Sequence, residues 1–150
     1  MTTLTTKRRR RAMPVRERLL RSIARRRGEV VLRRDLNCFG SPSQLSRSLR
    51  QLVADGKLVR IGLGIYAKAA PSPLSGQPAP RQGLAVLAVQ TLDRLGIEWQ
   101  PGEDQRLYNA GLTSQVPWRT SFDTGRRRIS RRLQVGLRVV DYENDYQKNG

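Results

Sequence analysis

The stretch SPSQLSRSLRQLVADG, residues 41–56, decides how the first half of this chain folds. Ser41 is a candidate N-cap, Pro42 suits the first helical position, and Gln44 completes a capping box. Gly56 marks the end of the helix. Together these signals predict an amphipathic helix, because the apolar residues between them recur at helical spacing. Those apolar residues are Leu45, Leu49, Leu52 and Val53.

The segments on either side of this helix add a basic helix before it and a β-hairpin after it. The hairpin is predicted from two apolar runs that meet at the tight reversal Gly62-Leu63-Gly64. The resulting order predicts a winged helix-turn-helix over residues 14–70. Its parts, in chain order, are a helix from Pro14 to Gly28, a short strand at 29–31, one or two helical turns at 32–36, a turn at 37–40, the helix at 41–56, and strands at 58–61 and 65–68.

The second half begins after a segment rich in proline. Pro71, Pro73, Pro78 and Pro80 predict an extended, semi-rigid linker over residues 71–82. A small α+β domain is predicted over residues 83–150, so the whole chain is expected to be of the α+β class. The elements expected in it are a helix at 83–95, a strand at 97–100, a helix at 103–110, strands at 118–122 and 126–129, and a hairpin at 133–135 and 137–140.

The charge of the chain is concentrated in its first half. The 150 residues hold 29 Lys and Arg against 12 Asp and Glu, a formal net charge of +17. Residues 1–70 hold 18 Lys and Arg against 4 Asp and Glu, a net +14, and residues 71–150 hold 11 against 8, a net +3. Such a field favours a polyanion, of which nucleic acid is the commonest in a cytoplasm. Residues 1–13 are predicted to be a disordered basic arm.

Several classes of function are disfavoured by composition. The chain has no histidine and 1 cysteine, so catalytic dyads and triads that use histidine, zinc sites and an internal disulfide are not expected. No apolar run approaches a membrane span, and no secretory signal is expected. The acidic groups at Glu103-Asp104 and at Asp141, Glu143 and Asp145 are interpreted as a helix start and a polar tail. We therefore expect no enzyme, no cofactor and no metal site.

A helix presented by a helix-turn-helix can enter the major groove of B-form DNA. On the helix at 41–56, Gln44 is suited to adenine and Arg47 to guanine, while serine hydroxyls suit phosphate or either base. The hairpin at 58–68 is expected to lie over neighbouring phosphates, and the arm could follow a groove. The predicted DNA contacts are Arg8, Arg9, Arg10, Arg11, Ser43, Gln44, Arg47, Ser48, Arg50, Gln51, Arg60 and Lys68.

Two stretches resemble the AbiEi-type antitoxins and their stand-alone relatives, which are winged-helix transcriptional regulators. One joins Arg27-Gly28-Glu29-Val30-Val31, the run from Leu45 to Arg60, and Gly62-Leu63-Gly64-Ile65-Tyr66. The other is Asn109-Ala110-Gly111-Leu112-Thr113-Ser114-Gln115-Val116-Pro117, followed by strands around Thr120 and by Asp123-Thr124-Gly125-Arg126. The chain is short compared with members that carry a larger C-terminal domain, and its arginine-rich arm is not a feature associated with the family.

The resemblance implies a repressor that binds inverted repeats in the promoter of its own operon. It further implies a nucleotidyltransferase-like toxin as partner, which this chain would oppose. By position, the resemblance gives the DNA-contacting role to Ser43, Gln44, Arg47, Ser48, Arg50 and Arg60. A homodimer and a cytoplasmic location are consistent with this role. Two alternatives remain open, a protein-binding antitoxin or adaptor module that neutralises a partner, and a basic RNA-binding protein.

Overall fold

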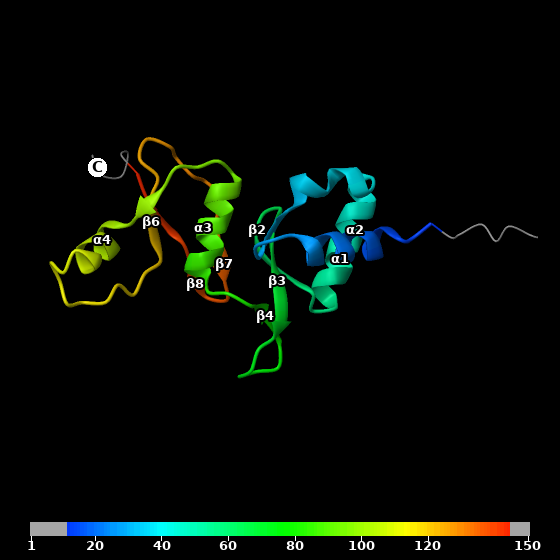
Figure 1. Ribbon diagram of the computed structural model, residues 1–150, viewed down its shortest axis with the longest axis horizontal. Coiled ribbons are helices and arrows are strands. Elements are labelled where there is room, and N and C mark those ends of the chain that lie inside the picture. Colours follow the sequence, from blue (N-terminus) through cyan, green and yellow to red (C-terminus); the bar gives the residue numbers. More distant parts are fainter. Residues whose placement is uncertain (1–11, 145–150) are drawn as a thin grey trace, which may run out of the picture.

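The computed structural model describes residues 12–144 and has a mixed α+β architecture (Figure 1). The predicted basic arm with Arg8, Arg9, Arg10 and Arg11 lies outside the described residues. The first half follows the predicted order of elements closely. These are α1 (Val15–Arg25), β1 (Val30–Leu32), the 3-10 helix η1 (Arg33–Phe39), α2 (Pro42–Ala54), β2 (Leu58–Gly62) and β3 (Ile65–Pro71).

The start of α2 is held by the predicted capping box. The Ser41 hydroxyl accepts a hydrogen bond from the Gln44 backbone N–H at 3.2 Å, and the Ser41 backbone N–H donates to the Gln44 side-chain oxygen at 2.9 Å. Both donors would otherwise lack a partner in the first turn. The helix is followed by Gly56, whose φ of +74° is readily adopted by glycine.

A four-stranded antiparallel sheet packs against α2, with three strands in the order β1-β3-β2 and a fourth paired to β3. The β2–β3 hairpin reverses at Leu63 and Gly64, and Gly64 has a φ of +69°. Beyond the predicted return strand, β3 continues to Pro71 and pairs with a further strand, β4 (Pro78–Pro80). Part of the segment predicted as a linker therefore folds back on the sheet. This added strand can carry two prolines because it lies at the sheet edge, where backbone donors are not needed on the outer side.

Both faces of this sheet are buried. Val31 and Leu58 pack with α1, η1 and α2, whereas Val30 and Leu32 pack with residues of the second half. Successive side chains of a strand point to opposite faces, so β1 contributes to both clusters. The division into domains at 14–70 and 83–150 stays a prediction. One buried cluster contains side chains from both of these ranges and joins them. The side chains of the shared cluster include Val30, Leu32, Ile61, Ile65, Ala67, Leu84, Leu87, Ala88, Leu92, Phe122, Leu133 and Val140.

Polar contacts also hold α3 (Leu84–Arg94) against the first half. The Gln90 side-chain oxygen accepts from the backbone N–H groups of Glu29, at 2.7 Å, and Val30, at 3.2 Å. Arg81 pairs with Glu29 at 2.6 Å, and this hydrogen bond raises the pKa of the Arg81 guanidinium. Arg94 forms an ion pair with Asp35. In Figure 1, α3 accordingly lies across the sheet from α1 and α2.

The rest of the second half contains a short helix and small sheets. The strand predicted at 118–122 begins three residues later, at Ser121. The strand predicted at 97–100 forms instead at Gln100–Pro101, and no strand forms at 126–129. The predicted polar tail forms a strand that pairs in parallel with β6. Its Tyr142 is half-buried, and burial raises the pKa of that phenol to about 12. The elements are β5 (Gln100–Pro101), α4 (Glu103–Asn109), β6 (Ser121–Asp123), β7 (Gln134–Val135), β8 (Arg138–Val139) and β9 (Asp141–Glu143).

The shared core predicts that a cavity in α3 destabilises both halves together. Leu87 is 0% exposed, and we expect Leu87→Ala to lower the free energy of unfolding by about 2 to 5 kcal/mol. Urea denaturation followed by far-UV circular dichroism and by tryptophan fluorescence measures this effect. Trp99 and Trp118 lie in the second half, so fluorescence follows that half, whereas α1 and α2 dominate the dichroism of the first half. The two transitions should coincide, because both halves share one core.

The matched control is Val86→Ala on the same helix, because Val86 is 43% exposed and should change stability little. Separate fluorescence and dichroism transitions in Leu87→Ala would contradict a shared core.

Candidate nucleic-acid interface

The outer side of α2 carries two exposed arginines. Arg47 is exposed and makes no hydrogen bond or ion pair within residues 12–144. Arg50 is also exposed, and its Nε donates to the Ser46 carbonyl of the preceding turn at 3.3 Å. Gln51 lies exposed next to Arg50. The helix therefore presents guanidinium groups to solvent, as predicted, with Arg47 available for an outside acceptor.

Ser48 does not belong to this exposed side. Its side chain is buried, with a residue exposure of 6%, so the prediction that it faces outward is wrong. The reason is its helical position, three residues after Leu45 and four before Leu52, which places it on the apolar stripe. A small hydroxyl fits there among leucines, and Ser48 is removed from the candidate contacts.

The polar residues of the first turn are exposed but already take part in the cap. The Gln44 side-chain oxygen is occupied by the Ser41 backbone N–H, and the Ser43 hydroxyl lies 3.2 Å from that of Ser41. A bidentate contact of Gln44 with adenine needs both its oxygen and its amide nitrogen. Such a contact would therefore compete with the capping box.

The β2–β3 hairpin, the predicted wing, carries one exposed cation of the two expected. Arg60 is exposed and its Nε donates to the Gly62 carbonyl at 3.2 Å. Lys68, by contrast, is half-buried, and its Nζ donates to the Arg26 carbonyl at 2.6 Å. The prediction that Lys68 flanks the hairpin tip is wrong, because this lysine ties β3 to the end of α1. Leu63 at the tip is 76% exposed.

The few acids near this surface are engaged. Asp55 at the end of α2 pairs with Arg16 of α1, Asp35 pairs with Arg94, and Glu29 pairs with Arg81. These exposed pairs contribute little to stability. They do cancel these three negative charges locally, so the exposed arginines of α2 and the hairpin keep their positive field.

Two further arginines hold the helices in place, and the sequence did not mark them as part of the site. Arg33 donates to the Pro42 carbonyl at 2.9 Å, where η1 meets the first residue of α2. Arg34 donates to the Arg94 carbonyl at the end of α3 at 2.8 Å. The sequence shows that both arginines follow β1 directly, but it does not show that their hydrogen-bond acceptors are the Pro42 and Arg94 carbonyls.

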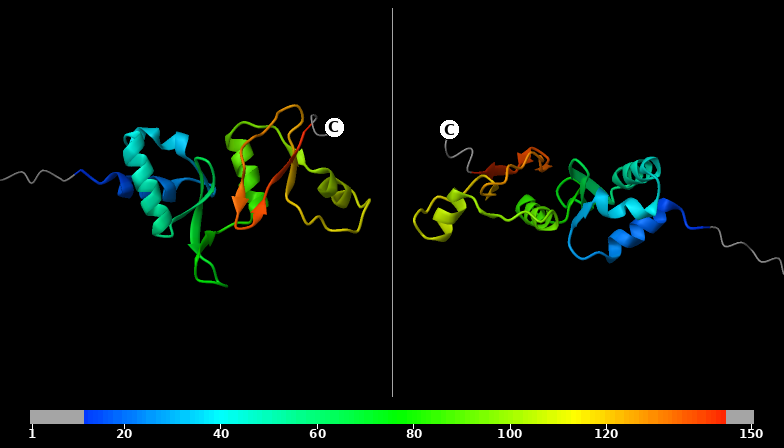
Figure 2. Two further views of the ribbon diagram at one scale, coloured as in Figure 1. Left: turned by 180° about the vertical axis from the view of Figure 1, so that it is seen from behind. Right: turned by 90° about the horizontal axis from the view of Figure 1, so that it is seen from above.

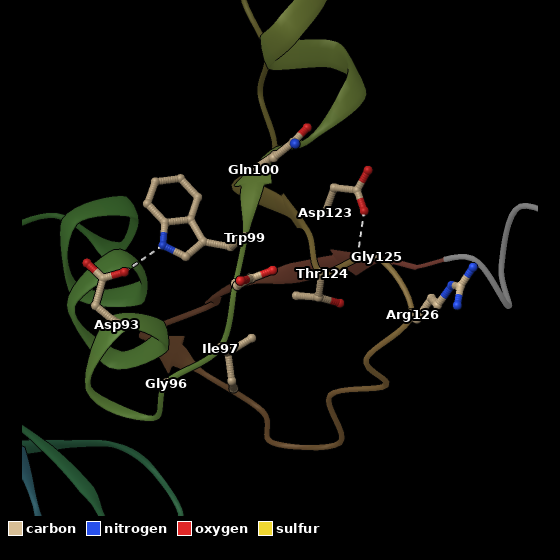
Figure 3. A pocket seen from close by; sticks show the side chains of 10 residues that line it. Asp93, Gly96, Ile97, Trp99, Gln100, Asp123, Thr124, Gly125 and Arg126 are labelled. Atoms are coloured by element: carbon tan, nitrogen blue, oxygen red, sulfur yellow. Dashed lines mark hydrogen bonds between the residues drawn. The ribbon is translucent and has the colours of Figure 1, made fainter.

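A hollow in the second half has a different character (Figure 3). It encloses about 950 Å³, and its lining includes Asp93, Glu98 and Asp123 together with Arg126. Trp99 donates its indole N–H to Asp93 at 2.8 Å and packs edge-on against Phe122, with ring centroids 5.3 Å apart. A wall with three carboxylates repels phosphate. No group of His, Cys, Asp and Glu that could hold a metal ion occurs among residues 12–144.

The sequence matches one described family. A family described as "Family of unknown function (DUF6088)" covers residues 17–150. No curated protein matches the chain. Between residues 12 and 144, no helix is both long enough and apolar enough to cross a membrane.

The capping box predicts a stability effect that is confined to the start of α2. Ser41→Ala removes the oxygen that accepts the Gln44 N–H, and we expect a loss of about 1 kcal/mol in the free energy of unfolding. Ser41→Asp keeps an acceptor at this position and should retain most of that stability. Urea denaturation of the two variants measures the difference. Equal stability of Ser41→Ala and the parent chain would contradict the cap.

Proposed function

The chain belongs to the DUF6088 family of unknown function, which matches it over residues 17–150, and we propose that it is a sequence-specific, double-stranded DNA-binding transcriptional regulator. One observation carries the proposal: a capped helix, α2, exposes Arg47 and Arg50 beside a hairpin whose Arg60 is also exposed. Guanidinium groups on a helix of this kind suit base edges in the major groove and phosphates at its walls.

The proposed arrangement is a winged helix-turn-helix. The order helix, strand, helix, helix, hairpin and the sheet order β1-β3-β2 support it. In this interpretation η1 and α2 form the helix-turn-helix, α2 enters the major groove, and β2–β3 is the wing. The turn between the two helices is short, because η1 ends at Phe39 and α2 begins at Pro42.

We assign base recognition to Arg47 and supporting contacts to its neighbours. Arg47 has free donors for the O6 and N7 acceptors of guanine. Arg50 and Gln51 lie one turn further along and suit the groove wall, and Arg60 suits a phosphate near the wing. Ser43 lies at the first turn, where helix N-termini and hydroxyls commonly meet phosphate.

The wider role that we propose follows the resemblance to AbiEi-type regulators. A repressor of its own operon would bind an inverted repeat, and a nucleotidyltransferase-like toxin would be encoded beside it. The adjacent reading frame tests the second part. A neighbouring nucleotidyltransferase-like gene supports an antitoxin, and any other neighbour supports a solitary regulator.

Arg47→Ala should weaken binding to a preferred site far more than binding to random DNA. We expect a loss of about 1 to 3 kcal/mol at the preferred site, the value of one good bidentate base contact. Fluorescence anisotropy with a duplex selected from a random pool and with a scrambled duplex measures both affinities. The matched control is Arg106→Ala on α4, which removes the same charge from a residue paired with Asp123.

If Arg47→Ala weakens both duplexes equally, its assignment to base recognition is wrong.

The charge of the proposed interface predicts a steep dependence on salt. With about 6 phosphates neutralised by the arm, α1, α2 and the wing, log K should fall against log[salt] with a slope of about −5. A salt titration of the wild-type chain on the selected duplex measures the slope. A flat titration would exclude an electrostatic interface of this size.

A second candidate function, pairing of two copies of the chain, is favoured by an exposed apolar strip far from α2. α4 has no buried residue, and the segment after it leaves Leu112, Val116 and Trp118 exposed, with Trp118 83% exposed. Apolar side chains gathered in this way mark contact surfaces. Light scattering of Trp118→Ser against the parent chain tests it: a dimer that becomes monomeric supports pairing, and a monomeric parent chain excludes it.

A further inference from the structure

The segment 126–132 packs directly against the hairpin of the candidate site. A Cβ placed on Gly62 would lie 2.8 Å from the Arg132 carbonyl oxygen, so only glycine allows the two backbones to approach this closely. The next residue, Leu133, is 1% exposed and belongs to the shared core. The end of this arginine-rich segment is therefore anchored beside the wing.

A groove between β2 and β7 joins arginines from the two halves. It encloses about 400 Å³ and is lined on one side by Arg60 and on the other by Arg132 and Gln134. Guanidinium groups on two sides of a groove provide several donors to one anion, the arrangement that suits a phosphate.

The opposite side of the hairpin tip repeats this arrangement. A hollow of about 500 Å³ is lined by Arg33, Arg34 and Arg131 together with Leu63 of the tip. A smaller hollow of about 220 Å³ brings Arg34 close to Arg127 and Arg128. We call this set the tip arginines: Arg33, Arg34, Arg60, Arg127, Arg128, Arg131 and Arg132.

Several of the tip arginines have free donors. Arg128, Arg131 and Arg132 are exposed and make no hydrogen bond or ion pair within residues 12–144. Asp35 of the first half pairs with Arg94 and also lies 3.9 Å from the Nε of Arg34, so Arg34 has a counter-charge. The like charges of Arg128, Arg131 and Arg132 repel each other, and an anion bound among them relieves the repulsion.

The β7–β8 hairpin, which follows Arg131 and Arg132 in the chain, lies on the side of the molecule that α2 occupies. Seen from behind in Figure 2, α2 and the β7–β8 hairpin stand in front of α1 and α3, with the β2–β3 hairpin between them. The view from above shows the same grouping. A rod-shaped ligand placed along this side would meet α2 first, then the β2–β3 hairpin, then the β7–β8 hairpin.

We propose that the tip arginines form a second surface that binds the phosphate backbone of the same DNA duplex, on the flank beyond the bases read by α2. The inference rests on the proposed function. Arginine side chains that reach phosphates carry no sequence information, so this surface adds affinity for any sequence and lengthens the stretch of DNA that one protomer covers.

The test compares Arg131→Ala/Arg132→Ala with Arg106→Ala/Arg119→Ala, which removes two arginines paired with Asp123 and Asp104. Both double variants lose the same net charge. Their affinities are measured on a long DNA duplex that contains the selected site, on a scrambled DNA duplex of equal length, on a short DNA duplex that covers only the selected site, and on a duplex RNA of the same length as the long duplex.

We expect Arg131→Ala/Arg132→Ala to bind both long duplexes about tenfold or more weakly, because hydrogen bonds to charged groups are lost. Its salt slope should be smaller by about 2, since each phosphate contact contributes about 0.9. On the short duplex, where the flank is missing, the variant should match the parent chain. Unchanged thermal unfolding shows that the exposed substitutions leave the fold intact.

The outcomes separate the two proposals. If the parent chain binds the selected duplex while the two double variants bind the long duplexes equally well, the second surface is excluded and the proposed function stands. If the parent chain binds no DNA duplex, both proposals fail. If Arg131→Ala/Arg132→Ala weakens binding only to duplex RNA, the assignment to DNA is overturned.

Discussion

The structure depends on a small sheet that is buried on both faces. β1 is three residues long, yet Val31 faces α1 and α2 while Val30 and Leu32 face α3. Alternation along the strand serves both clusters at once, which requires an uninterrupted apolar run. Because α3 closes the second face, the part after the proline segment is packed against the first part through a common core.

Much of the first half could be predicted from its sequence because its signals are local. The capping box and Gly56 identified α2, and Gly62-Leu63-Gly64 identified the hairpin. The folding back of Pro78–Pro80 onto β3 could not be predicted, since prolines favour a linker on composition and the pairing depends on where β3 happens to end. The strand at Asp141–Glu143 was missed for a similar reason, because the strand it pairs with, β6, is distant in sequence.

The candidate site shows where such prediction stops. Charge and helical position identified Arg47 and Arg50, and the structure leaves both exposed. The same signals also selected Lys68, which donates to the Arg26 carbonyl in the fold. A sequence shows that a side chain is cationic, but its acceptor is brought close only by tertiary packing. The edge of the apolar stripe on α2 was also mispredicted at Ser48. This residue is polar, which suggested an exposed position, but it is small enough to be buried among leucines.

The common core also bears on how affinity and specificity would be divided. Specificity requires a few side chains held in one register against base edges, and affinity requires many cations near phosphates. Gln90 and the shared cluster fix α3 to β1, and Leu133 fixes the end of the segment 126–132 beside the β2–β3 hairpin. A packed core of this kind resists movement of the two cationic surfaces relative to each other. If the proposed function holds, folding has already ordered the second surface. Its contacts with DNA then add to those of α2 without a further loss of conformational entropy on binding.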